Sequence, residues 1–382
     1  MKRLLLVGGG HAQLAVLQAL ARQRPRAVEA VLLTPSPWQW YSGMLPGWMA
    51  GHYRAEDCRI DLRPLAAAAG VRLCLAAAVA LDADRRRLQD DSGAIHDFDL
   101  LSLDVGSLTD THALEALPAG TLLPVKPLQA FFAAWPQRLA AARAGQLHRL
   151  AVVGGGAAGV ELVLAAAQAF RGASCTVALA LVAPPGGLLA GHAEGVRRRV
   201  ERRLAQAGIA LHLARAGGTA AGLVLDHGAG DAPAALPADC VIAATGARAL
   251  PWLRESGLAC DADGWVAVDA GHRSLSHPAI HAAGDVCTRA VPGFARSGVH
   301  AVHAGPVLAA NLLAALESGP ASTPPHTYRP RPRSLYLIAS GPRHAIASWG
   351  CWSAEGRWVW HWKAYLDRGF IARHRRAAIV PV

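Results

Sequence analysis

The most regular pattern of apolar and polar positions lies in the middle of the chain. An apolar run at 150–153 predicts a buried strand, and helical periodicity through 162–170 predicts the helix that follows it. Between them lies the turn Gly154-x-Gly156-x-x-Gly159. In such a turn the first glycine allows the tight bend, the second lets the backbone approach a pyrophosphate, and the third packs helix against strand. A further strand at 175–182 completes a βαβ unit, which is typical of dinucleotide binding at a helix N-terminus.

The N-terminal segment repeats this design. An apolar run at 4–7 precedes Gly8-Gly9-Gly10, and the pattern then predicts a helix at 14–22 and a strand at 28–34. Gln13 stands where the third glycine belongs, so this unit needs a wider gap between helix and strand. Two such units in one chain predict two bound dinucleotides.

The remaining segments alternate as in an α/β protein. Two further apolar strands end at Gly106 and at Gly246, and a third, at 279–283, ends in Gly284-Asp285, where the carboxylate would lie at the ligand-binding edge of a sheet. The other expected elements are a shaped loop at 35–49, short strands within 71–105, a connector at 118–127, helices at 128–142, 193–207 and 299–316, and a strand at 209–213.

Charge and cysteine content narrow the function classes. The 382-residue chain carries a net charge of +11, which favours anionic partners, but it has no nucleic-acid-binding motif, so we expect no nucleic-acid partner. Its seven cysteines are scattered without a C-x-x-C pair, so neither a zinc site nor a disulfide framework is indicated. No stretch reaches the roughly 18 uncharged apolar residues of a membrane span, and we expect a cytoplasmic protein.

Together these motifs resemble a known family. Three glycine motifs, around Gly8, Gly154 and Gly246, and the Gly284-Asp285 ending have the order and spacing of the two-dinucleotide flavoprotein reductases, the pyridine nucleotide-disulfide oxidoreductase superfamily. Four further segments resemble one branch, the type II NADH dehydrogenase-like proteins associated with selenide, water dikinase. These segments are 41–47, 188–192, 298–312 and 356–360.

The resemblance implies an α/β fold with two Rossmann-like dinucleotide-binding domains, the second inserted in the first, plus a small C-terminal domain. The FAD-binding domain would comprise 1–110 and 266–325, the NAD(P)H-binding domain 111–265, and the Trp-rich C-terminal domain 326–382. The cofactors would be FAD and NAD(P)H.

The resemblance also implies roles for particular residues. Gly8 and Gly10 would hold the FAD pyrophosphate, Asp285 the ribityl chain, and the N–H groups of Gly298 and Val299 would face the flavin pyrimidine edge. The Gly154, Gly156 and Gly159 turn would hold the NAD(P)H pyrophosphate, and Glu161 would act where nicotinamide meets flavin. The remaining expected cofactor contacts are His11, Ser42, Gly43, Gly106, Lys126, Thr245, Gly246 and Gly284. No metal ligand is expected.

Two of these residues have a second interpretation. His11 would either touch the FAD phosphate or pack against the helix start, and Lys126 would either reach the flavin or extend along the connector towards solvent. The chain also departs from the family pattern, because neither second strand ends in the acidic residue that binds a ribose. Ala183-Pro184 stands there in the second unit, which leaves NADH and NADPH both open. The C-x-x-x-x-C redox pair is missing, so disulfide chemistry is disfavoured.

These features predict an FAD-dependent NAD(P)H dehydrogenase that passes hydride to FAD and electrons on to a small quinone-like acceptor. One alternative is a sulfide:quinone oxidoreductase, which would need two cysteines at the flavin. The other is a low-turnover flavin-binding sensor or selenium-pathway partner.

The C-terminal part, from Tyr328, contains five of the chain's 11 tryptophans. A helix there would gather an aromatic face and set Lys363, Asp367 and Arg368 away from it, whereas a strand in its first half would align three tryptophans. The aromatic face is Trp358, Trp362, Tyr365, Leu366 and Phe370. Aromatic residues with a basic margin suit peripheral contact with the inner face of a membrane, or packing against the FAD-binding domain or a second subunit of a homodimer.

Overall fold

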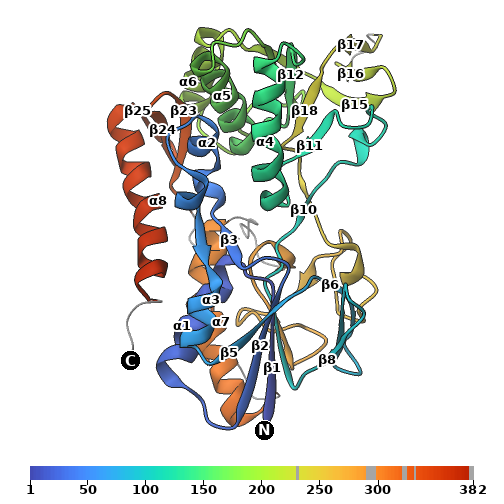
Figure 1. Cartoon of the computed structure of the whole chain (residues 1–382), viewed down its shortest axis with the longest axis vertical. Coiled ribbons are helices and arrows are strands. Elements are labelled where there is room, and N and C mark those ends of the chain that lie inside the picture. Colours follow the sequence, from blue (N-terminus) through green and yellow to red (C-terminus); the bar gives the residue numbers. More distant parts are fainter. Residues whose placement is uncertain (229–231, 290–297, 321–324, 331–332, 378–382) are drawn as a thin grey trace.

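The first parallel sheet is assembled from two distant parts of the chain. The computed structural model describes residues 1–228, 232–289, 298–320, 325–330 and 333–377. The sheet occupies the lower half of the molecule (Figure 1) and is completed by a strand that follows the whole second sheet in sequence. Its strand order is β21 (Ile280–Ala282), β9 (Leu100–Leu103), β1 (Lys2–Val7), β2 (Val28–Thr34) and β5 (Val71–Leu75).

Helices cover this sheet, and the longest of them is also the most apolar. They are α1 (His11–Gln23), α3 (Leu62–Ala68) and α7 (Gly298–Ser318). Helix α7 packs along α1 so closely that a Cβ at Gly305 would lie 3.1 Å from the Ala12 carbonyl oxygen. Within the described residues, α7 is the one helix long and apolar enough to cross a membrane, with a mean hydropathy of 1.5 and a 61% buried window. Its packing on α1 identifies it as a core helix of this unit.

The second parallel sheet has the same plan and lies in the upper half of Figure 1. Its order is β11 (Leu122–Pro124), β18 (Cys240–Ala243), β12 (Arg149–Val153), β13 (Ala178–Ala183) and β14 (Ala210–Leu213), with helices α4 (Leu128–Arg143), α5 (Ala157–Gly172) and α6 (Glu194–Gln206). The first glycine of each turn makes the same hydrogen bond to the neighbouring strand. Gly8 N–H donates to the Leu33 carbonyl, and Gly154 N–H donates to the Val182 carbonyl, each at 2.8 Å. The fold is therefore two Rossmann-like units, the second inserted in the first.

Smaller elements connect and flank these sheets. The short helices are α2 (Leu45–Met49), η1 (Ser42–Met44), η2 (Ala55–Cys58), η3 (His112–Leu114), η4 (Pro251–Leu253) and η5 (Gly284–Val286). The short strands are β3 (Trp38–Trp40), β4 (Arg59–Asp61), β6 (Ala78–Asp82), β7 (Arg87–Asp90), β8 (Ile95–Asp97), β10 (Leu108–Thr109), β15 (Arg215–Thr219), β16 (Gly222–Asp226), β17 (Ala234–Leu236), β19 (Ala247–Arg248), β20 (Val266–Ala267) and β22 (Cys287–Thr288). The predicted loop at 35–49 thus contains β3, η1 and α2, the connector at 118–127 contains β11, and the strand expected from 175 begins at Ala178.

The two glycine turns differ at their third position for a visible reason. In the second unit a Cβ at Gly159 would lie 1.9 Å from the Gly154 carbonyl oxygen, so only glycine fits. In the first unit Gln13 is fully buried, and its side-chain amide accepts from Ser102 Oγ at 2.9 Å and donates to the Ser102 carbonyl at 3.2 Å. The amide is therefore buried between α1 and β9 with both its oxygen and its nitrogen bonded to Ser102.

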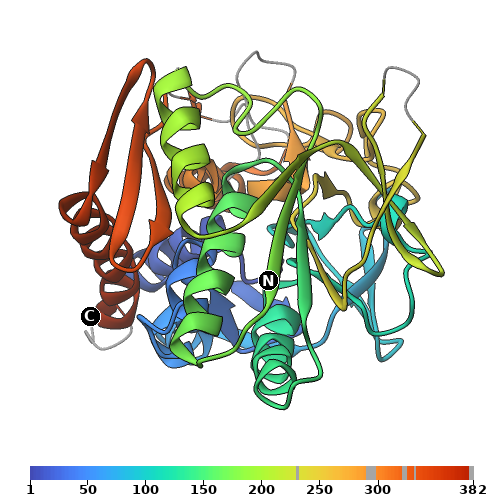
Figure 2. The same ribbon diagram turned by 90° about the horizontal axis from the view of Figure 1, so that it is seen from above.

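The C-terminal element is a three-stranded antiparallel sheet followed by one long helix. It comprises β23 (Tyr336–Gly341), β24 (His344–Trp349), β25 (Trp352–Gly356) and α8 (Arg357–Ala377). Figure 2 shows it on one flank of the molecule, beside α6 and opposite the β15–β17 sheet. The strand interpretation of its first tryptophans is wrong, because the helix begins at Arg357.

The expected aromatic face of this helix packs on the first unit only in part: the Phe370 ring stacks on Tyr41, with centroids 4.7 Å apart, but three other aromatic side chains do not pack there. Trp358, Trp362 and Tyr365 are exposed by 54%, 36% and 76%, while Asp367 is buried and Lys363 keeps only 13% of its side chain exposed. The buried face pairs those two charges and adds Val359, Trp360, Ala364 and Ile371. The helix therefore turns its ion pair inwards and exposes the side chains of Trp358, Trp362 and Tyr365.

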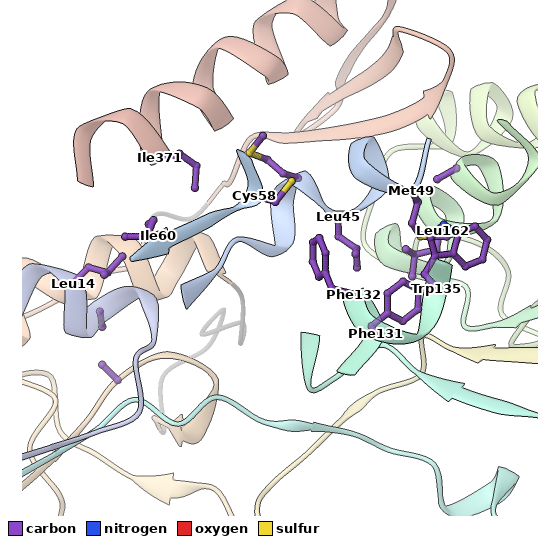
Figure 3. Close-up of a cluster of buried hydrophobic side chains, with 14 of the residues drawn as sticks. Leu14, Leu45, Met49, Cys58, Ile60, Phe131, Phe132, Trp135, Leu162 and Ile371 are labelled. Carbon is purple, nitrogen blue, oxygen red and sulfur yellow. The ribbon is translucent and has the colours of Figure 1, made fainter. Parts of the chain in front are cut away.

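An aromatic joint fixes the two units relative to each other. Figure 3 shows Phe131, Phe132 and Trp135 of α4 facing Leu45 and Met49 of α2. The Phe132 ring also contacts tryptophans of the first unit, with centroids 4.1 Å from Trp40 and 4.2 Å from Trp48. Large aromatic side chains bury much area at such a contact, so the joint holds α4 of the second unit against β3 and α2 of the first.

Candidate functional site

A cavity of about 520 Å³ opens where the two units meet. The first glycine turn lines it, whereas the second unit contributes residues of α5 but none of the glycines of its turn. The predicted residues on its wall are Gly8, Gly10, His11, Ser42, Gly106, Lys126, Glu161, Gly284, Asp285 and Gly298. These residues come from seven separate segments of the chain, and the parallel strands bring their ends to one edge.

The floor of the cavity is a carboxyl group that sequence analysis did not single out. Asp104 follows β9, is 3% exposed, and its Oδ2 accepts from the Gln13 N–H at 2.9 Å. A Cβ at Gly10 would lie 2.2 Å from this carboxyl, so Gly10 must be glycine here. Burial raises the pKa of Asp104 to about 7, although backbone N–H groups at the start of α1 oppose the shift. The signal in the sequence that could have identified Asp104 is its position directly after a buried strand.

An ion pair crosses the cavity wall between the two units. Lys126 Nζ lies 2.5 Å from Asp285 Oδ2 and also donates to Ser107 Oγ at 2.8 Å. Lys126 therefore extends into the cavity, and its contact with the flavin stays a prediction. A polar ligand entering here would meet a charged pair rather than an isolated carboxylate.

His11 lies at the start of α1 with one ring nitrogen occupied. Its Nδ1 lies 3.1 Å from Gln39 Nε2, whereas its buried Nε2 has no hydrogen-bond partner among the residues that the structure describes. Burial lowers the pKa of His11 to about 4, so the ring is neutral at physiological pH. An orphaned buried nitrogen on the cavity wall fits hydrogen bonding to a bound group.

Glu161 reaches the same cavity from the second unit. It lies in the second turn of α5, and its Oε1 accepts from the Ala339 N–H of β23 at 2.7 Å. Burial raises the pKa of Glu161 to about 7, and the nearby Lys363 ammonium opposes that shift. Glu161 can therefore change charge near neutral pH.

The buried face of α8 supports this wall with two charged groups, Lys363 and Asp367, that sequence analysis did not assign to the site. Lys363 Nζ donates to the Gly43 carbonyl at 2.8 Å and lies 3.1 Å from Asp367 Oδ2. Asp367 Oδ1 accepts from Tyr41 Oη at 3.1 Å, and burial raises the pKa of Tyr41. The C-terminal helix thus holds the 41–43 segment in place. The signal in the sequence that could have identified them is a pair of opposite charges four residues apart, Lys363 and Asp367, in an otherwise aromatic helix.

Seven predicted residues lie outside this cavity. Gly43 is next to it but faces Lys363, and Val299 is 42% exposed. The second turn lies away from it, and a Cβ at Gly156 would meet no atom within 4 Å, which leaves open space at the N-terminus of α5. Thr245 and Gly246 hydrogen-bond to Asp110, in the segment that connects the two units: Thr245 Oγ1 donates to the Asp110 carbonyl, and the Asp110 N–H donates to the Gly246 carbonyl. The seven are Gly43, Gly154, Gly156, Gly159, Thr245, Gly246 and Val299.

Sulfur is missing from the cavity. All seven cysteines fall within the described residues, and none lines its wall. The nearest in sequence to Asp285 is Cys287, which is buried and donates to the Gly284 carbonyl at 3.5 Å.

Comparison with known proteins agrees with this geometry. The profile of the pyridine nucleotide-disulphide oxidoreductase family matches residues 2–305, so the chain belongs to this family. It is an oxidoreductase whose cofactors are FAD and NAD(P)H. The glycine cradle and the orphaned His11 nitrogen fit a phosphate-bearing cofactor. No curated protein sequence matches the chain.

Solved structures of three oxidoreductases share the fold. NDH2 from Plasmodium falciparum in complex with NADH has a TM-score of 0.83 at 12% identity, over 100% of this chain and 97% of that one. The sulfide:quinone oxidoreductase of Aquifex aeolicus has a TM-score of 0.79 at 16% identity, over 99% and 92%. The water-forming NADH oxidase of Lactobacillus brevis has 0.73 at 18%, over 91% and 75%.

Proposed function

We propose that this protein is a type II NADH dehydrogenase-like enzyme, which transfers hydride from NAD(P)H to FAD and electrons on to a quinone-like acceptor. The observation that carries the proposal is the shared cavity, where Gly8, Gly10 and Asp285 of the first unit face Glu161 of the second. A flavin held by the first unit would then lie within reach of a nicotinamide held by α5. The association with selenide, water dikinase stays a prediction.

The chain's own groups would position the cofactors and balance their charge. Gly10 and the N-terminus of α1 would bind the FAD pyrophosphate, and Asp285 with Lys126 would bind the polar chain between phosphate and ring. Bound FAD would supply the redox chemistry. Trp38, Trp40 and Pro46 would exclude water from one side of the cavity.

The absence of cysteine from the wall argues against a sulfur substrate. Oxidation of sulfide or reduction of a disulfide through cysteine requires a thiol at the flavin, and each of the seven described cysteines lies elsewhere. A small planar acceptor needs only access to the reduced ring. This argument favours a quinone over a sulfur substrate.

Anaerobic titration tests the proposal. NADH or NADPH added to the FAD-loaded protein should bleach the flavin absorbance within the mixing time, and a short-chain quinone should restore it. Sulfide should leave the absorbance unchanged. Bleaching by sulfide alone would favour the sulfide:quinone oxidoreductase alternative, and no bleaching by any of the three donors would favour the flavin-binding sensor.

The rate of flavin reduction should depend on pH through Glu161. Because the pKa of Glu161 is raised to about 7, the side chain is neutral below that pH and anionic above it. An anion beside the nicotinamide stabilises its developing positive charge, so the rate should rise through pH 7 by about fivefold, equivalent to about 1 kcal/mol. Stopped-flow reduction should give this step in the wild type and a flat profile in Glu161→Gln.

A second variant separates this charge effect from simple misfolding. Lys363 lowers the pKa of Glu161, so Lys363→Met should move the step to higher pH without removing it. A wild-type profile without a step near pH 7 would remove Glu161 from the proposed role.

We also propose that the exposed face of α8 contacts an anionic membrane surface, where quinones dissolve. Trp358, Trp362 and Tyr365 point outwards, and the exposed Arg357 and Arg368 flank them. Aromatic rings with a basic margin are typical of interfacial helices. The net charge of +11 adds attraction to anionic headgroups.

Vesicle co-sedimentation should detect this contact. The wild type should pellet with anionic vesicles at low salt, and Trp358→Ser/Trp362→Ser/Tyr365→Ser should reduce the bound fraction about tenfold, since interfacial binding scales with buried apolar area. A matched control replaces three exposed leucines elsewhere: Leu75, Leu213 and Leu275. Removing the whole element would be a poorer test, because Lys363 and Ala339 bond to the cavity wall. Equal pelleting of both triple variants would contradict the proposal, and concentration-dependent dimers lost only in the aromatic variant would indicate a second subunit instead.

A further inference from the structure

Three chemically different metal-ligand side chains meet at the outer edge of the first sheet. They are Cys74 on β5, Asp90 at the end of β7 and His96 on β8. The Cys74 Sγ, an Asp90 carboxylate oxygen and a His96 ring nitrogen all lie within 4.8 Å of one another. Figure 1 shows β6 and β8 beside the first sheet. The three side chains therefore come from two separate sheets that lie next to each other. The site is separate from the cavity and takes no part in the proposed reaction.

Only one carboxylate oxygen of Asp90 is directed towards the other two side chains, because the turn after β7 binds the other oxygen. Its Oδ1 accepts from Ser92 Oγ at 2.6 Å and from the Ser92 and Ala94 N–H groups at 3.0 Å each, which fixes the turn after β7. Its Oδ2 is left to His96 Nε2, at 2.7 Å. The side chain is 2% exposed, and the hydrogen bond from His96 heads the interactions that hold the pKa of Asp90 well below its usual range. Asp90 is therefore a buried carboxylate with one oxygen directed at the other two groups.

We propose that Cys74, Asp90 and His96 bind one Zn²⁺ ion, with water in the fourth position. A thiolate, a carboxylate and a neutral imidazole together balance the +2 charge, and zinc accepts sulfur, nitrogen and oxygen in one tetrahedral site. Binding would replace the His96–Asp90 hydrogen bond, because two ligand atoms on a tetrahedral zinc lie about 3.3 Å apart. His96 can move by that amount, since β8 is an edge strand of its sheet.

The ion would join β5 to the β7–β8 hairpin close to the cavity. Ala77 and Ala78 line the cavity, and Ala77 is tied to the same hairpin by two hydrogen bonds with Asp91, of 2.8 and 3.0 Å. Sequence analysis indicated no zinc site because the three ligands are 16 and 6 residues apart and show no short metal-binding spacing. Only the pairing of the strands brings them together.

Metal titration of the chelator-treated, FAD-loaded protein tests the proposal. Zn²⁺ should bind with one tight equivalent by calorimetry, and Co²⁺ should give tetrahedral d–d bands at wavelengths longer than those absorbed by oxidised flavin. Cys74→Ser should weaken binding at least about tenfold and change the cobalt spectrum, and His96→Gln should do the same. Cys351→Ser, which changes an exposed cysteine at a distance, should bind as the wild type does.

Proton release distinguishes a thiolate site from adsorption to other histidines. A metal-bound cysteine loses its proton, so calorimetry in buffers of different ionisation enthalpy should detect proton release in the wild type and less in Cys74→Ser. His96→Gln can still hydrogen-bond to Asp90, so its thermal unfolding in chelator should match the wild type and show that the turn is intact. Unchanged binding in both ligand variants, or no tight equivalent in the wild type, would overturn the proposal.

Discussion

Asp285→Ala should be purified with most of its FAD lost. Asp285 lies at the strand-end edge of the first sheet, lines the cavity and pairs with Lys126 at 2.5 Å, so the substitution removes both a charged hydrogen-bond acceptor and the partner of a lysine. Hydrogen bonds to charged groups contribute about 1.5–3 kcal/mol, which corresponds to roughly 10- to 150-fold weaker FAD binding. The measurement is the ratio of flavin to protein absorbance after dialysis, followed by titration with FAD.

Two further variants make this result specific. Asp263→Ala removes an exposed aspartate from the same part of the chain and should keep full flavin occupancy. Asp285→Asn keeps a hydrogen-bonding oxygen without the charge and should fall between the other two. Full occupancy in Asp285→Ala, with wild-type affinity, would exclude Asp285 from the flavin site.

Gly156→Val should abolish flavin reduction by NAD(P)H while leaving FAD bound. A Cβ at Gly156 meets no protein atom within 4 Å, and its φ of −78° is open to any residue. A side chain there therefore costs the fold little but occupies the space at the N-terminus of α5 where a pyrophosphate would bind. The loss should exceed about 100-fold in the stopped-flow reduction rate, because close backbone approach to the phosphates is what the second glycine allows.

Helix α5 supplies its own control for this prediction. Gly172 ends the same helix, and a Cβ there also meets no atom within 4 Å, so Gly172→Val adds the same side chain to this helix without touching the turn. The flavin of Gly172→Val should be reduced by NAD(P)H as fast as that of the wild type. If Gly156→Val is also reduced at the wild-type rate, the turn is a packing feature and the nicotinamide binds elsewhere.

Sequence patterns predicted those elements of the fold whose physical cause is local, such as a buried apolar strand or a glycine turn. The strand at 28–34 has the predicted bounds, and both glycine turns open helices, because apolar runs and glycine positions encode burial and backbone freedom directly. Gln13 is instructive, since the structure accommodates it in place of the third glycine by burying its side-chain amide against Ser102.

The faces of α8 could not be predicted in the same way. Helical periodicity separates Trp358 and Trp362 from Lys363 and Asp367, but it does not say which set is buried. Burial of the charged set is tolerable only because Tyr41 and the Gly43 carbonyl supply partners from 320 or more residues away. Those partners are invisible until the chain is folded.

The sequence by itself determined two dinucleotide-binding units, their order, and the glycines and strand-end carboxylate that surround the cavity, since each is a short-range pattern with a local physical cause. The tertiary structure alone decided three things: the Lys126–Asp285 pair, the Asp104 floor under Gly10, and the meeting of Cys74, Asp90 and His96. Each of these joins side chains from different elements. Strand order and helix packing set their distances, and neither is encoded in the spacing of residues along the chain.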